Sequence, residues 1–215
     1  MPAAGRVVDI DASRLPGWVD RFTARHGTLE ITALERTALR LDAADGARAE
    51  IAVPYGGLPE SADAPLLTQL VAHVRRPRTI GVLLVRRRGW AAGVVRSGAL
   101  IAADAGGGHV QSRSKAGGWS QQRFARRRGN QAQQVYDRAI ERAAAALLPY
   151  RAELDALLTG GDRAGVAAVL DDARLVPLAR LAEPRLLAVP DPTRAVLEDV
   201  VSRLTSVVIT LNELA

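Results

Sequence analysis

One apolar run in the middle of the chain constrains the fold more than any other feature of the sequence. Residues 79–85 read Thr-Ile-Gly-Val-Leu-Leu-Val, a run that is long enough and rich enough in β-branched side chains for a buried strand. A turn over 86–89 leads to a second apolar segment over 90–95. Ser97 and Gly98 then form another turn before a third segment over 99–103. Three short strands joined by turns in this way predict a β-meander.

Strands and helices alternate on both sides of this meander. Apolar periodicity predicts helices over 11–24, 65–74, 162–170 and 191–204, and strands over 28–34, 37–41, 49–53, 185–189 and 206–211. The glycine-rich stretch 105–108 is predicted to be a loop. This mixture indicates an α+β (mixed α/β) class, in which a mixed β-sheet is flanked by helices. We expect an N-terminal α/β portion over 1–76, packed on the core, and a further domain over 77–215.

The composition excludes several classes of protein and of site. With 215 residues, 48 % of them hydrophobic, the chain can bury a core and is not expected to be disordered. It has no cysteine, and its histidines, His26, His73 and His109, lack the spacing of metal ligands, so we expect no disulfide, no metal and no other cofactor. Neither a secretory signal nor an apolar stretch of about 18 residues is visible, which predicts a cytoplasmic protein that does not span a membrane.

Charge is distributed unevenly along the chain. Thirteen basic residues and one acidic residue, Asp104, lie between Arg75 and Arg128, so this block carries a net charge of +12 although the whole chain carries +6. A block so depleted of acids predicts a face that binds a polyanion such as RNA. The alternative is a compositional bias toward arginine, because the chain has 28 arginines and a single lysine. Such a bias does not explain why the acids are missing from one segment.

A loop and a long helix form the C-terminal end of this block. Nothing apolar repeats over 114–119, which predicts a loop, and Ser120 can cap a helix that runs to about Leu148. Positive charge at a helix N-terminus opposes the macrodipole, so the arginines there favour phosphate contact over helix stability. The predicted inner face of the helix comprises Phe124, Val135, Tyr136, Ala139, Ile140, Ala143 and Leu147.

Aromatic and amide side chains interrupt the basic residues of this segment. Trp119 stands beside Gly117 and Gly118 and has no obvious core to join; it either stacks on a nucleobase or covers the start of the helix. Gln121 and Gln122 follow at the helix start, where a neutral amide can orient a water molecule or a hydroxyl group without itself transferring a proton. The alternative interpretation of such amides is an ordinary polar helix surface.

At these residues the sequence resembles the middle domain of eukaryotic and archaeal class-1 translation release factors. In that family a Gly-Gly-Gln loop precedes a Ser-x-x-Arg-Phe-x-Arg helix, and here the same meander is followed by Gly117-Gly118-Trp119-Ser120-Gln121-Gln122-Arg123-Phe124-Ala125-Arg126. The chain is still more similar to the Vms-like release factor (VLRF) family, whose actinobacterial members are described as peptidyl-tRNA hydrolases. The resemblance covers residues 79–215 and not the first 75.

The resemblance implies a peptidyl-tRNA hydrolase that releases nascent chains from stalled ribosomes or large ribosomal subunits, in translation quality control. Gly117 and Gly118 would enter the peptidyl-transferase centre, and Gln121 or Gln122 would place the attacking water. Trp119 occupies the position of the family's catalytic glutamine, which makes the assignment of the active amide depend on a shifted loop. The residues implied to contact rRNA or tRNA are Arg113, Lys115, Ser120, Arg123, Arg126, Arg127 and Arg128.

Three alternatives stay open at this point. The first is a factor that binds ribosomes without catalysis, because Trp119 replaces the expected glutamine. The second is a nuclease that cleaves the tRNA near its 3′ CCA end, and the third is a generic RNA-binding protein. The implied partners are the large ribosomal subunit and peptidyl-tRNA, with no membrane and no cofactor, and a monomer is favoured. No decoding-type domain is recognisable, so codon-specific termination is not expected.

Overall fold

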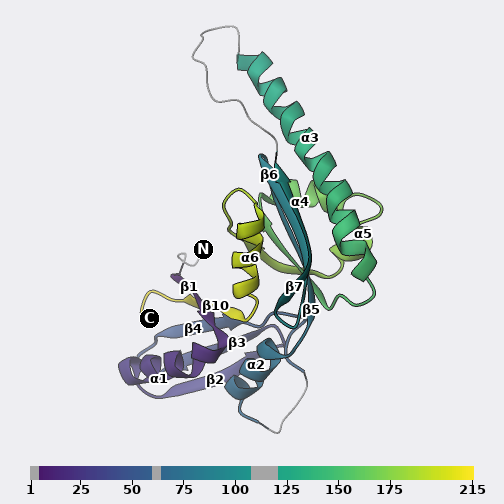
Figure 1. Cartoon of the computed structure of the whole chain (residues 1–215). Helices are drawn as coiled ribbons and strands as arrows, with labels where there is room; N and C mark the ends of the chain where they lie inside the picture. The colour runs from purple at the N-terminus through teal and green to yellow at the C-terminus, as the bar shows by residue number, and fades with distance from the viewer. Residues whose placement is uncertain (1–4, 60–63, 108–120) are drawn as a thin grey trace. The chain divides into compact units, whose positions relative to one another are not determined.

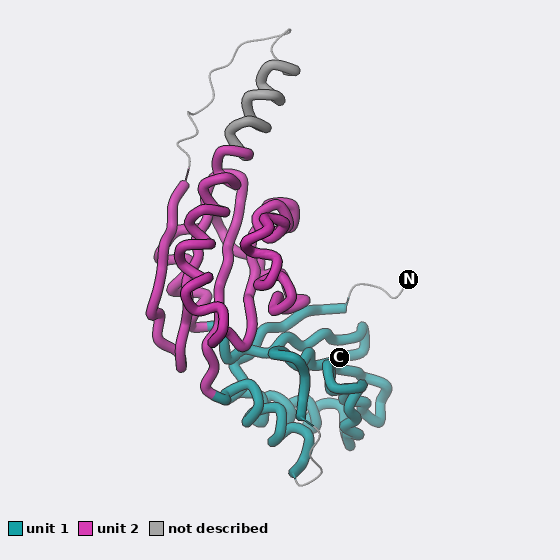
Figure 2. The backbone as a smooth tube through the Cα atoms, turned by 90° about the vertical axis from the view of Figure 1, so that its right-hand side faces the viewer, with its two compact units in different colours: residues 1–76, 203–215 teal, residues 77–202 magenta. Residues whose placement is uncertain are grey.

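The computed structural model describes the backbone of residues 5–59, 64–107 and 121–215, and their side chains except those of 121–132. The chain divides into two compact units (Figure 2). One comprises Met1–Arg76 with Arg203–Ala215, and the other comprises Pro77–Ser202. The expected division placed 203–215 with the second domain. The structure groups this segment with the first unit, because its strand pairs there.

The first unit is built on a five-stranded sheet in the order β1-β10-β4-β3-β2, with all neighbours antiparallel. Its strands are β1 (Val7–Asp11), β2 (Leu29–Leu34), β3 (Ala38–Ala43), β4 (Arg48–Ala52) and β10 (Ser206–Leu211). Alternate residues of β4 are buried and exposed, as expected when one face of a sheet is covered. The covered face packs against α1 (Leu15–His26), which follows a short 3-10 helix η1 (Ala12–Arg14), and against α2 (Leu66–Arg75).

The second unit is built on a mixed sheet in the order β7-β6-β5-β8-β9. The strands β5 (Thr79–Arg86), β6 (Gly89–Arg96) and β7 (Ala99–Gly107) form the predicted meander, and this prediction is confirmed. β8 (Ala156–Gly161) then pairs with β5 and β9 (Ala182–Leu187) pairs with β8, both in parallel. The α+β class with a mixed sheet flanked by helices is confirmed as well.

Helices cover both faces of this mixed sheet (Figure 1). α3 (Gln121–Leu147), which continues into the 3-10 helix η2 (Leu148–Tyr150), shares one hydrophobic cluster with α4 (Arg163–Leu170) and α5 (Val176–Ala179). α6 (Arg194–Ser202) packs on the opposite face. The central strand β5 is buried from Ile80 to Val85, which explains why its sequence is an uninterrupted apolar run.

The glycines at the end of the meander differ from their prediction. Gly106 and Gly107 were predicted to lie in a loop, but they continue β7 and pair with Trp90 and Gly89 of β6. A side chain at Gly106 would place its Cβ 2.9 Å from the Trp90 ring, and one at Gly107 would place it 2.7 Å from the carbonyl oxygen of Arg88. These glycines are therefore required for close approach, and not for a flexible turn.

Candidate nucleic-acid interface

The predicted site residues fall into two groups with respect to the structure. Arg113, Lys115, Gly117, Gly118, Trp119 and Ser120 belong to 108–120, which lies outside the described residues. The remaining predicted residues lie on α3, whose backbone is described, and they are Gln121, Gln122, Arg123, Arg126, Arg127 and Arg128. The helix predicted over 120–148 is observed over Gln121–Leu147. The geometry of the interface therefore rests on how α3 is held.

The C-terminal part of α3 is anchored in the core of its unit. Val135, Ala139, Ala143 and Leu147 are spaced four residues apart, and each exposes at most 4 % of its surface. This spacing forms one apolar stripe along the helix, and two alanines in it allow the helix to approach the sheet closely. The predicted inner face is confirmed from Val135 onward, whereas Phe124 belongs to the side chains that are not described.

The N-terminal part of α3 precedes this stripe by several turns. At a rise of 1.5 Å per residue, the helix axis from Gln121 to Val135 is about 21 Å long. Arg123 lies about 18 Å from Val135 along that axis, and Arg128 lies about 10 Å from it. The arginines are therefore carried on helical backbone that is continuous with an anchored segment.

Helix register also separates the arginines from the apolar stripe around the axis. At about 100° per residue, Arg123, Arg126 and Arg127 fall within about 100° of one another and share one side of the helix. By the same count, Ala139 and Ala143 lie on the opposite side. The three positions thus define an arginine face, which is on another side of the helix than the middle of the apolar stripe.

A groove lies beside the anchored part of α3, where the helix faces the start of β6 and the end of β7. Its volume is about 520 Å³, and its walls include Trp90, Gly106, Arg138 and both members of an ion pair. In that pair the Arg142 guanidinium lies 3.3 Å from the carboxylate of Asp104. Asp104 is the single acid of the basic block, and it is paired with an arginine outside that block, so it does not neutralise the arginine face.

A cluster of three charged side chains fastens the exposed side of α3 to the segment after α4. Arg174 donates hydrogen bonds to Glu141 at 2.8 Å and to Asp172 at 2.8 Å. The hydrogen bond from Arg174 lowers the pKa of Glu141 and that of Asp172 below their ordinary values, and it raises the pKa of Arg174. Asp172, Arg174 and Glu141 thus tie α3 to the chain segment between α4 and α5.

The described part of the second unit carries no conventional acid–base centre. Thr159 is its one buried polar or charged side chain among the residues with described burial. Within the described ranges there is no group of three or more side chains that could hold a metal ion, and no helix is long and apolar enough to cross a membrane.

A comparison with known protein families matches the part of the chain that contains α3. The sequence model of the Actinobacteria/chloroflexi VLRF1 release factors (acVLRF1) matches residues 78–210, which is more than half of the chain. A crystal structure of the archaeal translation termination factor aRF1 is similar over 58 % of this chain and 34 % of its own, at 17 % sequence identity and a TM-score of 0.43. This chain thus matches about a third of the archaeal factor's length. No curated protein is similar enough to count as a match.

Proposed function

Because the chain belongs to the family of actinobacterial and chloroflexi VLRF1 release factors and so has a role in translation, we propose that it is a ribosome-associated peptidyl-tRNA hydrolase. It would release nascent chains from stalled ribosomes or large ribosomal subunits. The observation that carries the proposal is the division of α3 into a C-terminal half anchored by its apolar stripe and an N-terminal half whose sequence carries the arginine face. Its partners would be the large subunit and peptidyl-tRNA, which would place the protein in the cytoplasm.

The arginine face supplies the grip that such a role needs. Arg123, Arg126 and Arg127 share one side of α3 by helix register and could neutralise phosphates of rRNA or tRNA, releasing condensed counterions. Gly117 and Gly118 would approach the RNA backbone closely, because glycine has no Cβ. Binding of this kind depends steeply on salt concentration, which gives the proposal a direct physical signature.

The chemistry is hydrolysis of the ester that joins the peptide to the tRNA. A water oxygen attacks the ester carbonyl carbon, the bond from that carbon to the ribose oxygen breaks, and a proton passes to the departing ribose oxygen. The products are a peptide with a free carboxyl group and a tRNA with an intact 3′ hydroxyl. In a site made mostly of RNA, the contribution of the protein is to hold the water in line with the carbonyl.

Helix register favours Gln122 over Gln121 for this positioning role. Gln122 is four residues before Arg126 and lies about 40° from it around the helix. Gln121 is eighteen residues, or five full turns, before Ala139, so it lies in line with the middle of the apolar stripe. An amide at Gln122 would thus sit beside the arginine face, where RNA would be bound.

The decisive experiment incubates the full chain with stalled large-subunit–peptidyl-tRNA complexes and resolves the products. Free peptide with intact tRNA supports hydrolysis. Peptide that still carries CCA shows that the protein is a nuclease, and retained binding without release shows a non-catalytic factor. The last outcome is the one that Trp119 at the glutamine position would favour, so Trp119→Ala, Gln121→Ala and Gln122→Ala are tested separately.

A further inference from the structure

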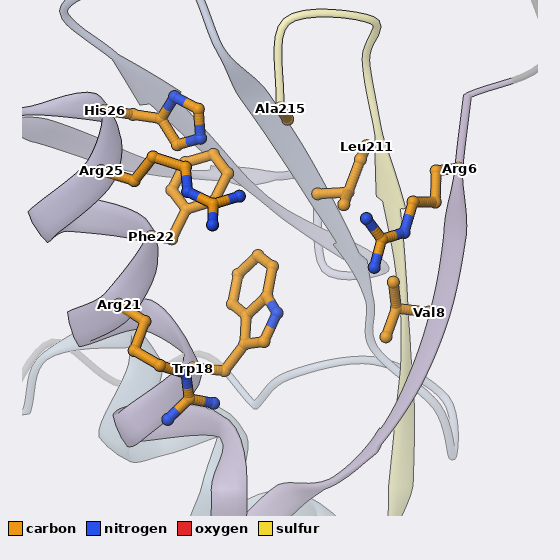
Figure 3. Close-up of a pocket in the computed structure, with 9 residues that line it drawn as sticks. All are labelled: Arg6, Val8, Trp18, Arg21, Phe22, Arg25, His26, Leu211 and Ala215. Atoms are coloured by element: carbon orange, nitrogen blue, oxygen red, sulfur yellow. The ribbon is translucent and has the colours of Figure 1, made fainter.

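The first unit contains a pocket that the proposed function does not use (Figure 3). It lies between α1 and the β1–β10 side of the sheet, and its volume is about 320 Å³, at the lower end of the range for small-ligand sites. All of its walls belong to the first unit, and the matched family region begins only at residue 78. Its lining residues include Trp18, Phe22 and His26 on one side and Val8 and Leu211 on the other.

Three aromatic rings on α1 form one wall of this pocket. Their spacing of four residues places them on one side of the helix. The rings of Trp18 and Phe22 stack with centroids 5.2 Å apart and planes inclined at 21°, and the Phe22 and His26 rings follow at 4.6 Å. Phe22 and His26 are buried, whereas Trp18 is only partly buried. The indole of Trp18 is therefore the aromatic surface that a ligand can reach.

Three arginines, Arg6, Arg21 and Arg25, border the same pocket, and all are exposed. No ion pair with a carboxylate is found for any of them among the described residues. The unit as a whole has ten arginines and eleven acidic side chains. The cluster is therefore not an average property of this unit, and no acid lines the pocket.

Two acids near the pocket wall formed by α1, Asp45 and Asp20, are directed elsewhere. Asp45 accepts a hydrogen bond from Nδ1 of His26 at 2.9 Å and another from the backbone amide of Ala47 at 3.0 Å. Those two bonds, that from Ala47 first, lower the pKa of Asp45. Asp20 is two residues from Trp18 on α1 and so lies about 160° away from it around the helix. Positive charge beside an accessible indole is thus left without a described counter-charge.

We propose that this pocket binds one unstacked nucleotide of single-stranded RNA. The base lies on the Trp18 indole, and the flanking phosphates are bound by Arg6, Arg21 and Arg25. An acidic peptide would use the guanidinium groups but would leave the aromatic surface unused. No Asn, Gln, Asp, Glu, Ser or Thr side chain lines the pocket to read base edges, so binding tolerates any base. The pocket is a second RNA contact, and it does not depend on peptide hydrolysis.

The test measures binding of a short fluorescein-labelled oligoadenylate to the full chain in solution. The parent protein carries Arg123→Gln, Arg126→Gln and Arg127→Gln, so that the arginine face of α3 contributes little. Arg6→Gln, Arg21→Gln and Arg25→Gln are added together, and Arg14→Gln serves as the matched control, because Arg14 is an exposed arginine of the same unit that does not line the pocket. Because the substituted side chains are exposed, the fold is expected to be retained.

The triple substitution in the pocket is expected to weaken binding at least about tenfold and to reduce the slope of log affinity against log salt by about 2, since each phosphate contact on a single strand contributes about 0.7. Arg14→Gln is expected to leave both quantities unchanged. Unchanged affinity in the pocket variant, or an equal loss in the Arg14 control, would overturn the proposal.

A second variant isolates the stacking surface. Trp18→Leu keeps an apolar side chain against the core and is expected to weaken binding between about fivefold and a hundredfold, which is the span of base–aromatic stacking. Thermal unfolding of this variant, monitored by circular dichroism, checks that it remains folded, and the arginine variants keep the test decisive if it does not. Equal affinity for duplex RNA, or displacement of the oligoadenylate by an equal charge of polyglutamate, would refute a nucleotide site.

Discussion

The two halves of α3 differ in the side chains that they carry, although they form one continuous helix. In the C-terminal half the apolar stripe is buried, and two charged side chains, Arg142 and Glu141, are paired with Asp104 and Arg174. The N-terminal half has four arginines and no acid between 121 and 136, although positive charge there opposes the helix dipole. Under the proposed function, folding and binding are separated along this helix, so substitutions in one half should not have the effects of substitutions in the other.

The largest expected effect is on stability, from the anchored half. Leu147 is fully buried at the end of the stripe. Leu147→Ala should lower the free energy of unfolding by about 2–5 kcal/mol, because it removes buried methyl groups and leaves a cavity. Urea denaturation followed by circular dichroism measures the change. Gln134→Ala, at an exposed position of the same helix, is expected to stay within about 0.5 kcal/mol of the parent, and equal losses in both variants would contradict the anchoring role of the stripe.

The next largest effect is expected on binding to the large ribosomal subunit, from the N-terminal half of α3. Reversing charge at Arg123, Arg126 and Arg127 to glutamate should weaken binding to large ribosomal subunits by about a hundredfold and reduce the salt slope by about 2 to 3. The same change should leave the melting temperature unchanged or raise it, because acids favour a helix N-terminus. Co-sedimentation across a salt series and thermal unfolding measure the two quantities.

The matched control for this charge reversal is Arg138→Glu, which changes an exposed arginine in the anchored half of the same helix. It should keep most of the affinity for the large subunit. If Arg138→Glu loses as much affinity as the triple variant, binding to the large subunit does not depend on which half of α3 carries the charge.

Local sequence patterns predicted where strands lie better than they predicted which strands pair with each other. The meander was predictable because its three strands are adjacent in sequence and joined by short turns. β10 was predicted at its observed limits of 206–211 but placed in the wrong unit, since its partners β1 and β4 lie far away in sequence. β8, with the sequence Ala-Leu-Leu-Thr-Gly-Gly, was missed, because its parallel partner, β5, lies far before it in sequence, on the other side of a long helix.

The two proposed nucleic-acid surfaces differ in the same way. The arginines of α3 lie close together in sequence, so charge counting was enough to propose them as a binding surface. The pocket of the first unit joins α1 to Arg6 on one terminal segment and to Leu211 on the other, so no local pattern reveals it. Trp18 packs against the core, as is ordinary for a tryptophan on an amphipathic helix, but it also lines the pocket. Spacing on α1 was the one available signal, since Arg21 and Arg25 follow Trp18 on the same side of the helix.

A smaller effect, on the rate of peptide release, is expected at the N-terminal end of α3. If the arginine face holds the RNA, the amide beside it should matter more than the amide on the side of the apolar stripe. We expect Gln122→Ala to slow peptide release about tenfold relative to Gln121→Ala. Without the amide at 122, the attacking water would be held less well in line with the ester, which lowers the rate but leaves binding intact. Single-turnover release from stalled large-subunit complexes measures this difference. Equal rates for the two variants would show that helix register does not select the active amide.

The smallest effect is a pH dependence confined to the anchored half. The pKa of Glu141 is lowered in the folded protein, chiefly by the hydrogen bond from Arg174, so the folded state binds a proton on Glu141 less readily than the unfolded state does. Its contribution to stability is therefore fully present above the ordinary glutamate pKa of about 4.3 and is lost as the pH falls through the lower, folded value. Glu141→Gln should accordingly lower the melting temperature at pH 7, by a small amount because the pair is exposed to solvent, and this difference should shrink as the pH is lowered below about 4. Thermal unfolding of both proteins over that pH range measures the difference, and a gap that grows on acidification would mean that Glu141 does not stabilise this half of the helix through its charge.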